Sequence, residues 1–141
     1  MKQNSYFDIG ANLTHESFDK DFNKVIEEAK MHDVKKICIT STSIEDTKIS
    51  LKLLEKNEDF FITTCGIHPH YADSFKESNI EEIKKLSEHA AIKAIGETGL
   101  DFNRNFSKKE NQILCFNSQI EVAQELNLPL FLHQRDAHKN F

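Results

Sequence analysis

The sequence predicts an α/β fold built on parallel strands, because short apolar runs alternate with longer amphipathic segments along all 141 residues. One repeat of strand, loop and helix takes roughly 30 residues, which is the length of a βαβ unit. No low-complexity tract and no linker rich in proline or glycine divides the chain, so we treat residues 1–141 as one domain. Two folds fit this pattern: an open doubly wound sheet, and part of a (β/α)8 barrel.

Five strands and four helices are expected. The strands correspond to runs of apolar and β-branched residues at positions 7–10, 36–40, 60–66, 91–96 and 130–133. Apolar residues at intervals of three and four predict the first helix between Phe18 and Ala29. The other three helices are expected to begin at Ser43, Ser78 and Ser107, because an acidic residue three positions after each serine completes a capping box.

The segment after the first strand separates the two folds. A dinucleotide-binding sheet carries the pattern G-x-G-x-x-G there, whereas residues 10–15 of this chain read Gly-Ala-Asn-Leu-Thr-His. This difference disfavours the doubly wound sheet and leaves the partial barrel as the predicted fold. A complete barrel takes about 250 residues, so this chain is little over half of one.

The composition is that of an ordinary globular protein, with 38% hydrophobic and 29% charged residues. The net charge is -5, and no block of basic residues indicates a broad binding surface for duplex DNA. A nucleic-acid substrate is still compatible with this charge, because a bound divalent cation can hold a phosphate locally.

Three cysteines, Cys38, Cys65 and Cys115, lie in apolar or amphipathic segments without C-x-x-C spacing. They are interpreted as buried, reduced thiols, which suit a reducing compartment. The first six residues contain no apolar segment typical of a signal peptide, and no apolar stretch is long enough to span a bilayer. We therefore expect a cytoplasmic protein that does not bind membranes.

Polar side chains follow four of the predicted strands at their carboxyl ends. Because these ends meet at one face of a parallel barrel, we expect the side chains to converge on a single site. In chain order they are Asp8, Asn12, His68, His70, Glu97, Asp101, His133, Arg135 and Asp136. The histidines without such positions are interpreted as surface residues, namely His15, His32, His89 and His138.

Glu97 and His133 are the candidate metal ligands. Gly96 and Gly99 are expected to turn the backbone tightly around Glu97, which would expose its carboxylate to a divalent cation or as a general base. His133 closes a buried apolar run, where an imidazole can bind a metal. The alternatives are a capping acid at position 97 and a core-edge histidine at position 133. Asp101 either supports Glu97 or anchors the loop that follows it.

Two arginines and one histidine, His68, are the candidate phosphate contacts. Arg104 and Arg135 lie on the predicted site face, and a guanidinium can bind a phosphate through two parallel hydrogen bonds. Arg104 is alternatively a solvated loop residue. His68 and His70 flank Pro69, which stiffens the loop and fixes the direction of both imidazoles.

Four segments of the chain resemble the TatD-related metal-dependent deoxyribonucleases. They are residues 8–14 (DIGANLT), 66–70 (GIHPH), 95–107 (IGETGLDFNRNFS) and 132–138 (LHQRDAH). The resemblance covers essentially the whole chain and implies a (β/α)8 barrel related to the amidohydrolases. It also implies metal-dependent hydrolysis of phosphodiester bonds, typically by 3′-5′ exonuclease action on single-stranded DNA, with RNA as an open alternative substrate.

The resemblance assigns roles to individual residues. Glu97 and His133 would bind metal, with Glu97 bridging wherever two ions bind, and His68 would act beside Glu97 in catalysis by orienting the scissile phosphate or the attacking water. From their positions and chemistry alone, Arg104 and Arg135 are expected to contact substrate phosphate together with His68. Supporting positions would be Asp8, Asn12, His70, Asp101 and Asp136. Mg²⁺ is the expected cofactor, although a glutamate and histidine pair also suits Mn²⁺ or Zn²⁺.

The chain departs from the wider family in two places. Most members carry Asp-x-His-x-His on the first strand, where this chain has Asp8, Gly10 and Asn12. The missing histidine pair argues against a hydrolase of carbon–nitrogen bonds, which is the third function considered. The family's later histidine and aspartate ligands would lie beyond Phe141, so the chain looks like the N-terminal half of such a barrel.

These departures leave two main functions open. One is a truncated nuclease that acts on the ends of single-stranded DNA or RNA. The other is an inactive half-barrel or one half of a split protein. The first and fifth strands would both expose unpaired edges, which favour self-association or pairing with a complementary C-terminal half. We therefore expect the isolated chain to be oligomeric, partly disordered or marginally stable.

Overall fold

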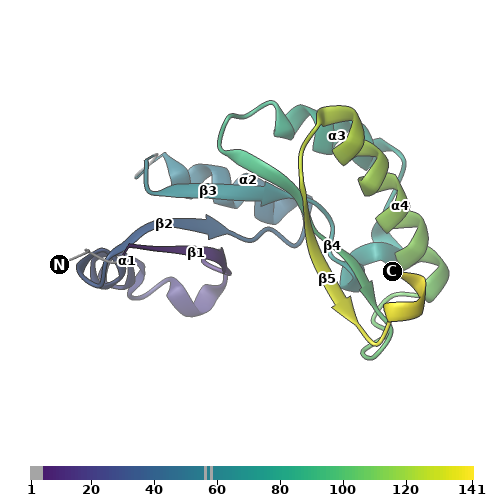
Figure 1. The fold of residues 1–141 in the computed structure, drawn as a ribbon, viewed down its shortest axis with the longest axis horizontal. Helices are drawn as coiled ribbons and strands as arrows, with labels where there is room; N and C mark the ends of the chain where they lie inside the picture. Colours follow the sequence, from purple (N-terminus) through teal and green to yellow (C-terminus); the bar gives the residue numbers. More distant parts are fainter. Residues whose placement is uncertain (1–4, 56, 58) are drawn as a thin grey trace.

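The computed structural model describes residues 5–55, 57 and 59–141 (Figure 1). The strands are β1 (Tyr6–Ala11), β2 (Val34–Ile39), β3 (Phe61–Cys65), β4 (Ile92–Asp101) and β5 (Leu130–Arg135). The α-helices are α1 (Phe22–Met31), α2 (Ile44–Leu54), α3 (Ser78–Ser87) and α4 (Lys109–Leu126). Three short 3₁₀ helices complete the described elements: η1 (Glu16–Phe18), η2 (Pro69–Ser74) and η3 (His138–Asn140).

All five strands belong to one parallel sheet, in the order β1-β2-β3-β4-β5. A doubly wound sheet reverses its strand order at a switch point, whereas a barrel adds each strand beside the previous one. The sequential order therefore supports the partial barrel over the doubly wound alternative. β1 and β5 are the edge strands of the described sheet, as the sequence predicted.

The helices pack outside the strands that precede or follow them. Helix α1 contacts β2, α2 contacts β3, and α4 contacts β4, while α3 lies between α2 and α4. Figure 1 shows α3 and α4 along one side of β4 and β5, with the sheet strongly twisted between β1 and β5. The largest core cluster lies between β3, β4 and these helices, and it includes Cys65, Ile83, Ile92, Ile95 and Val122. This packing fixes the strands whose ends carry the candidate site.

The helix starts agree with the sequence only in part. Ser43 caps α2 as predicted, because its hydroxyl accepts a hydrogen bond from the Asp46 amide at 3.1 Å. The prediction for α3 was wrong, since Ser78 is already the first helical residue. Ser107 does not cap α4, because its hydroxyl bonds to η2 instead. Phe18 belongs to η1, so the first α-helix begins later than its apolar pattern indicated.

Strand β4 continues past the glycines that were expected to form a turn. Gly96 and Gly99 have φ angles of +144° and +142°, but both lie inside the strand. A Cβ atom at Gly96 would collide with the carbonyl oxygen of Phe131, and one at Gly99 with that of His133. The glycines therefore allow β5 to approach β4 closely. As a result, Glu97 and Asp101 project from a rigid strand and not from a loop.

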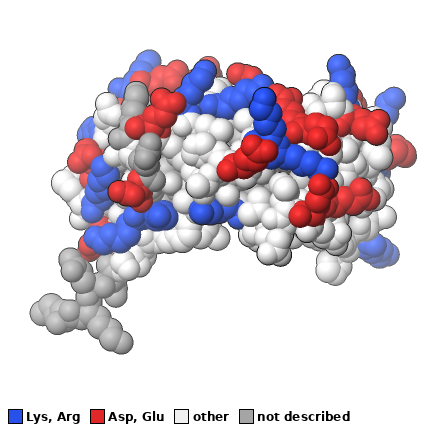
Figure 2. All heavy atoms as spheres, turned by 90° about the horizontal axis from the view of Figure 1, so that it is seen from above, with Lys and Arg blue, Asp and Glu red and all other residues white. Residues whose placement is uncertain are grey.

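The surface fits the bulk composition. Figure 2 shows acidic and basic side chains interspersed over one face of the molecule, without a large area of basic charge. Cys38, Cys65 and Cys115 are buried and free, as predicted, and burial raises the pKa of the Cys38 and Cys65 thiols to about 11. No helix within the described ranges has the length and apolar character needed to cross a membrane. The four histidines interpreted as surface residues are all exposed.

Candidate active site

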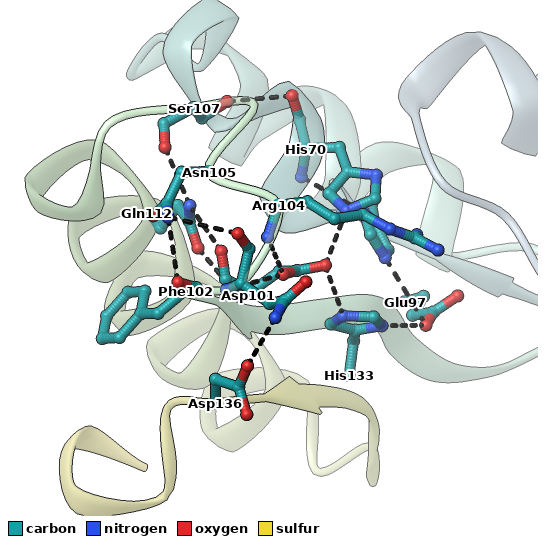
Figure 3. Close-up of polar contacts among 12 residues, drawn as sticks. His70, Glu97, Asp101, Phe102, Arg104, Asn105, Ser107, Gln112, His133 and Asp136 are labelled. Atoms are coloured by element: carbon teal, nitrogen blue, oxygen red, sulfur yellow. Dashed lines mark hydrogen bonds and ion pairs between the residues drawn. The ribbon is translucent and has the colours of Figure 1, made fainter.

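Five of the predicted site residues converge at the carboxyl ends of three consecutive strands (Figure 3). His68 caps the start of η2 just after β3, and His70 lies within η2. Glu97 and Asp101 project from β4, and His133 projects from β5. Their separation in the sequence is large, so it is the parallel sheet that brings them together. We call these five residues the polar cluster.

The segment after β2 holds the backbone of the polar cluster in place. The Glu97 amide donates a hydrogen bond to the Ser41 carbonyl at 2.8 Å, and the His68 amide donates to the Thr42 carbonyl at 2.9 Å. The Ser41 amide in turn donates to the Thr64 hydroxyl at 3.0 Å. The segment after β2, itself bonded to β3, therefore fixes the positions from which the two side chains project. The sequence analysis did not identify Ser41 or Thr42.

Asp101 is a fully buried carboxylate at the centre of the polar cluster. One oxygen accepts from the Asn103 and Arg104 amides, and the other faces Nε2 of His70 at 2.8 Å and Nε2 of His133 at 3.2 Å. Burial acts to raise the pKa of this carboxyl, but the hydrogen bonds together outweigh burial and hold the pKa well below its usual range. Asp101 is therefore ionised, and its histidine neighbours act as hydrogen-bond donors.

The proton positions on His133 follow from this arrangement. Because its Nε2 donates to an ionised carboxylate, a neutral His133 carries its lone pair on Nδ1. That Nδ1 lies 3.0 Å from Oε1 of Glu97. Two atoms that both bear lone pairs require a proton or a cation between them at this distance. Glu97 and His133 thus form a pair with the chemistry of a cation site, oriented from behind by Asp101.

His68 differs from His133 in its protonation. Its Nδ1 accepts from the His70 amide at 3.1 Å, so the neutral ring carries its proton on Nε2, which lies 3.6 Å from Oε1 of Glu97. Burial, with smaller contributions from His133 and His70, lowers the pKa of His68 to about 3. The ring is consequently a neutral hydrogen-bond donor at ordinary pH, and Nε2 offers a proton and no lone pair.

Helix α4 supports the polar cluster through two buried glutamines. The Gln112 side chain accepts from the Asp101 amide at 2.8 Å and donates to the Asp101 carbonyl at 3.2 Å. The Gln119 side chain makes the same pair of bonds with the backbone of Ile67, at 2.8 and 3.0 Å. Sequence analysis missed both residues. The available signal was that two uncharged polar residues lie two helical turns apart among the apolar positions of α4.

The loop after β4 is tied to the rest of the site. The Ser107 hydroxyl donates to the His70 carbonyl at 2.9 Å and accepts from the Asp73 amide at 3.1 Å. Asp136 accepts from the Asn103 side chain at 2.7 Å, so it holds this loop and makes no described contact with the polar cluster. Arg104 is exposed, and Figure 3 shows its side chain extending over the cluster toward Glu97. The Arg104 charge is among the causes that lower the pKa of His68.

Strand β1 contributes less to the site than the sequence suggested. Asn12 lines a cavity of about 280 Å³ that Glu97 also lines, between β1 and β5. The Asp8 carboxylate accepts from the Gly10 amide at 3.1 Å. Among the described residues, no side-chain hydrogen bond or ion pair joins Asp8 or Arg135 to the polar cluster, and their roles stay predictions.

The residues of the polar cluster suit a divalent cation. Ring nitrogens of His68, His70 and His133 lie within 4.8 Å of one another, and the carboxylates of Glu97 and Asp101 contact them. Carboxylate oxygen and imidazole nitrogen together suit Mg²⁺, Mn²⁺ or Zn²⁺. His133 presents a lone pair on Nδ1 beside the Glu97 carboxylate, whereas His68 presents a proton on Nε2. Glu97 and His133 are therefore better placed than His68 to bind the cation.

Relatives of known sequence match nearly the whole chain. The family model described as TatD related DNase matches residues 7–141. The chain is 42% identical over 135 residues to a protein from Erwinia amylovora named 3′-5′ ssDNA/RNA exonuclease TatD. It is 44% identical to a protein of the same name from Erwinia tasmaniensis. Both matches cover 96% of this chain but 52% of the relative, so the chain spans about half the length of these relatives.

Solved structures agree with this comparison. A TatD-family hydrolase from Entamoeba histolytica superposes with a TM-score of 0.88 at 29% identity, and a TatD homolog from Escherichia coli K12 with a TM-score of 0.85 at 25% identity. Each match covers 96% of this chain and 52% of the solved chain. The predicted fold, a (β/α) barrel truncated to five strands, is thereby confirmed. The chain belongs to the TatD-related DNase family.

Proposed function

We propose that this chain carries the metal- and phosphate-binding half of a nuclease that removes nucleotides from the 3′ end of single-stranded DNA or RNA. The observation that carries the proposal is the pair formed by Glu97 Oε1 and His133 Nδ1, 3.0 Å apart on neighbouring strands. The relatives named as 3′-5′ ssDNA/RNA exonucleases support the substrate class. Residues 1–141 act in this proposal as one partial barrel domain.

Glu97 and His133 would hold the cation in this nuclease. Asp101 would orient His133 through its Nε2, as carboxylates behind metal-binding histidines do. A bound divalent cation polarises a phosphoryl oxygen and lowers the pKa of coordinated water. We favour Mg²⁺, because it binds through few protein carboxylates and keeps several waters, with Mn²⁺ and Zn²⁺ as alternatives.

His68 and Arg104 would act on the phosphate. The Nε2 proton of His68 points toward Glu97 and can be donated in a hydrogen bond to a phosphate oxygen or to the attacking water. Its low pKa keeps the imidazole neutral, so this donor role persists across the physiological pH range. Arg104 would neutralise phosphate charge from the loop above the cluster. His70 would support the site through its bond to Asp101.

Cleavage of an end-labelled single strand tests the proposal. The purified chain is incubated with a 5′-labelled oligonucleotide and Mg²⁺, with EDTA in a parallel reaction. We expect stepwise shortening from the 3′ end that EDTA abolishes and that Glu97→Gln lowers at least about 100-fold. Glu28→Gln is the matched control, because it removes an exposed carboxylate on α1. Equal cleavage by Glu97→Gln and the control would exclude Glu97 as the metal-binding residue.

A second candidate function is that of one half of a split barrel, inactive alone. The exposed edges favour it: Phe7 and Ile9 on β1 are 50% and 67% exposed, and Leu132 on β5 is 47% exposed. Co-purification with the C-terminal half of the Erwinia tasmaniensis relative, followed by the cleavage assay on each half and on the mixture, would test it. Cleavage that appears only after the halves are mixed favours the split barrel, and full activity of the chain alone excludes it.

The cellular location is also part of the proposal. We place the protein in the cytoplasm, because its three cysteines are buried free thiols, which suit a reducing compartment.

A further inference from the structure

Phe106 is an exposed aromatic residue at the edge of the polar cluster. Its side chain is 68% exposed, and its ring centroid lies 4.8 Å from that of His70 with the planes at 77°. The edge-type contact leaves most of the phenyl ring facing solvent. Of the exposed aromatic residues described, Phe106 is the one whose ring packs against a histidine of the cluster.

Single exposed apolar residues are ordinary on protein surfaces, so exposure alone decides nothing. The loop that carries Phe106, however, is fixed on both sides of it. Before Phe106, Asn105 has a φ of +51° and its side chain donates to the Phe102 carbonyl at 2.9 Å. After it, Ser107 is buried and bonded to His70 and Asp73. The ring is therefore presented to solvent by a loop held in one conformation.

The neighbours of Phe106 define what it can bind. The Arg104 side chain extends over the cluster (Figure 3), and the ring centroids of His68 and His70 lie 4.2 Å apart. Because Phe106 packs against His70, a planar group next to a phosphate at these groups is within reach of the phenyl ring. In a nucleic acid that planar group is a nucleobase, and an aromatic side chain is the usual stacking surface for an unpaired base.

We propose that Phe106 is the stacking platform for an unpaired nucleobase next to the scissile phosphate. The inference rests on the proposed nuclease function and adds to it a reason for single-strand preference. Bases inside a duplex are stacked on their neighbours and cannot cover the phenyl ring, whereas a terminal base of a single strand can. Phe106 thus contributes to binding and specificity, and it takes no part in the chemical step.

Fluorescence of 2-aminopurine tests the stacking directly. The probe is a short single strand with phosphorothioate linkages, which resist cleavage, and with 2-aminopurine at the 3′ end. The full chain is titrated into it with Mg²⁺, because stacking on an aromatic ring quenches this base. Anisotropy of the same strand with a 5′ fluorophore reports binding separately. The variants are Phe106→Trp, Phe106→Leu and Phe106→Ala, with Leu114→Ala as control because Leu114 is an exposed apolar residue on α4.

Stacking predicts a specific order among the variants. The original chain, Phe106→Trp and the control quench the probe, while Phe106→Leu and Phe106→Ala do not and bind about tenfold more weakly. Phe106→Leu is the decisive variant, because it keeps an apolar side chain of similar size and removes the π surface. Quenching and affinity for Phe106→Leu equal to those of the original chain would overturn the inference. Absence of quenching by the original chain would overturn it as well.

The two proposals fail in different ways. Unaltered quenching in Phe106→Leu with metal-dependent cleavage intact removes the stacking platform and leaves the nuclease. The expected quenching order without cleavage of a phosphodiester strand supports the stacking platform and removes the nuclease function of the isolated chain.

Discussion

The two sides of the site differ in how their polar residues are held. At the ends of β3, β4 and β5, side chains bond across strands, as His133 does to both Glu97 and Asp101. At the end of β1, the side-chain hydrogen bonds among the described residues are local, as that of Asp8 to Gly10 is. The backbones differ likewise, because Gln112 and Gln119 hold the first region, whereas β1 is an exposed edge. The cation site that we propose for this half-barrel therefore depends on β3, β4 and β5, and β1 lies beside it.

The largest expected effect is the loss of stability caused by a glycine substitution in β4. The matched glycine substitution in β1 is the comparison. Gly99→Ala would place a Cβ against the His133 carbonyl at a φ that alanine tolerates poorly, and should lower the free energy of unfolding by about 4 kcal/mol. Gly10→Ala meets only the far end of the Phe131 ring and the Thr40 hydroxyl, at 3.1 and 3.3 Å, and should change it by less than about 1 kcal/mol. Urea unfolding of both variants measures the contrast. Equal losses of unfolding free energy in the two variants would mean that the backbone is packed equally closely in the two regions.

Removing a glutamine of α4 should have the next largest effect. Gln112→Ala leaves the amide and carbonyl of Asp101 buried without their partner, which should cost about 3 kcal/mol of unfolding free energy. The exposed Gln124 on the same helix supplies the control, since Gln124→Ala should stay within about 0.5 kcal/mol. Chemical denaturation of both proteins gives the comparison. A loss below about 1 kcal/mol for Gln112→Ala would show that the glutamine does not hold the strand.

The pH dependence of stability provides a third, smaller test. The pKa of His68 is about 3 in the folded chain and 6.5 when unperturbed, so between these values the unfolded chain binds more protons. The free energy of unfolding therefore falls as the pH is lowered, by about 2 kcal/mol between pH 7 and pH 5. His68→Gln should lose this part of the slope, and the exposed His15→Gln should keep it. Unfolding curves in EDTA at several pH values measure this dependence. If the free energy of unfolding of His68→Gln depends on pH as strongly as that of the original chain, burial of His68 is not its cause.

The smallest effect is expected at β1. Asp8→Asn keeps an oxygen that can accept from the Gly10 amide, and Asp8 makes no described contact with the polar cluster. The affinity of the Asp8→Asn protein for Mn²⁺, measured by calorimetry, should therefore differ less than about twofold from that of the original chain. A loss of tenfold or more would place Asp8 among the metal ligands and would remove the distinction between the two regions.

The sequence predicted the convergence of the site well, because the ends of parallel strands must meet. His68, Glu97, Asp101 and His133 all followed from that rule. The course of β4 was not predictable in this way. Glycines usually indicate a turn, and nothing local at Gly99 shows that β5 will approach so closely.

Polar residues with distant partners were also beyond sequence reasoning. Ser107 has the spacing of a helix cap, but its hydroxyl is taken by the carbonyl of His70, which is far away along the chain. Gln112 and Gln119 interrupt the apolar positions of α4, but the sequence does not show that their partners are the backbones of Asp101 and Ile67. Tertiary contacts of this kind override local patterns and cannot be read from spacing.

Calorimetric titration of the chain with Mn²⁺, beside Glu97→Gln and Glu28→Gln, tests the central claim most directly. We expect Glu28→Gln to bind like the original chain and Glu97→Gln to lose at least about 100-fold in affinity, because the carboxylate facing Nδ1 of His133 is gone. Equal affinity of the three proteins would contradict a cation site between β4 and β5.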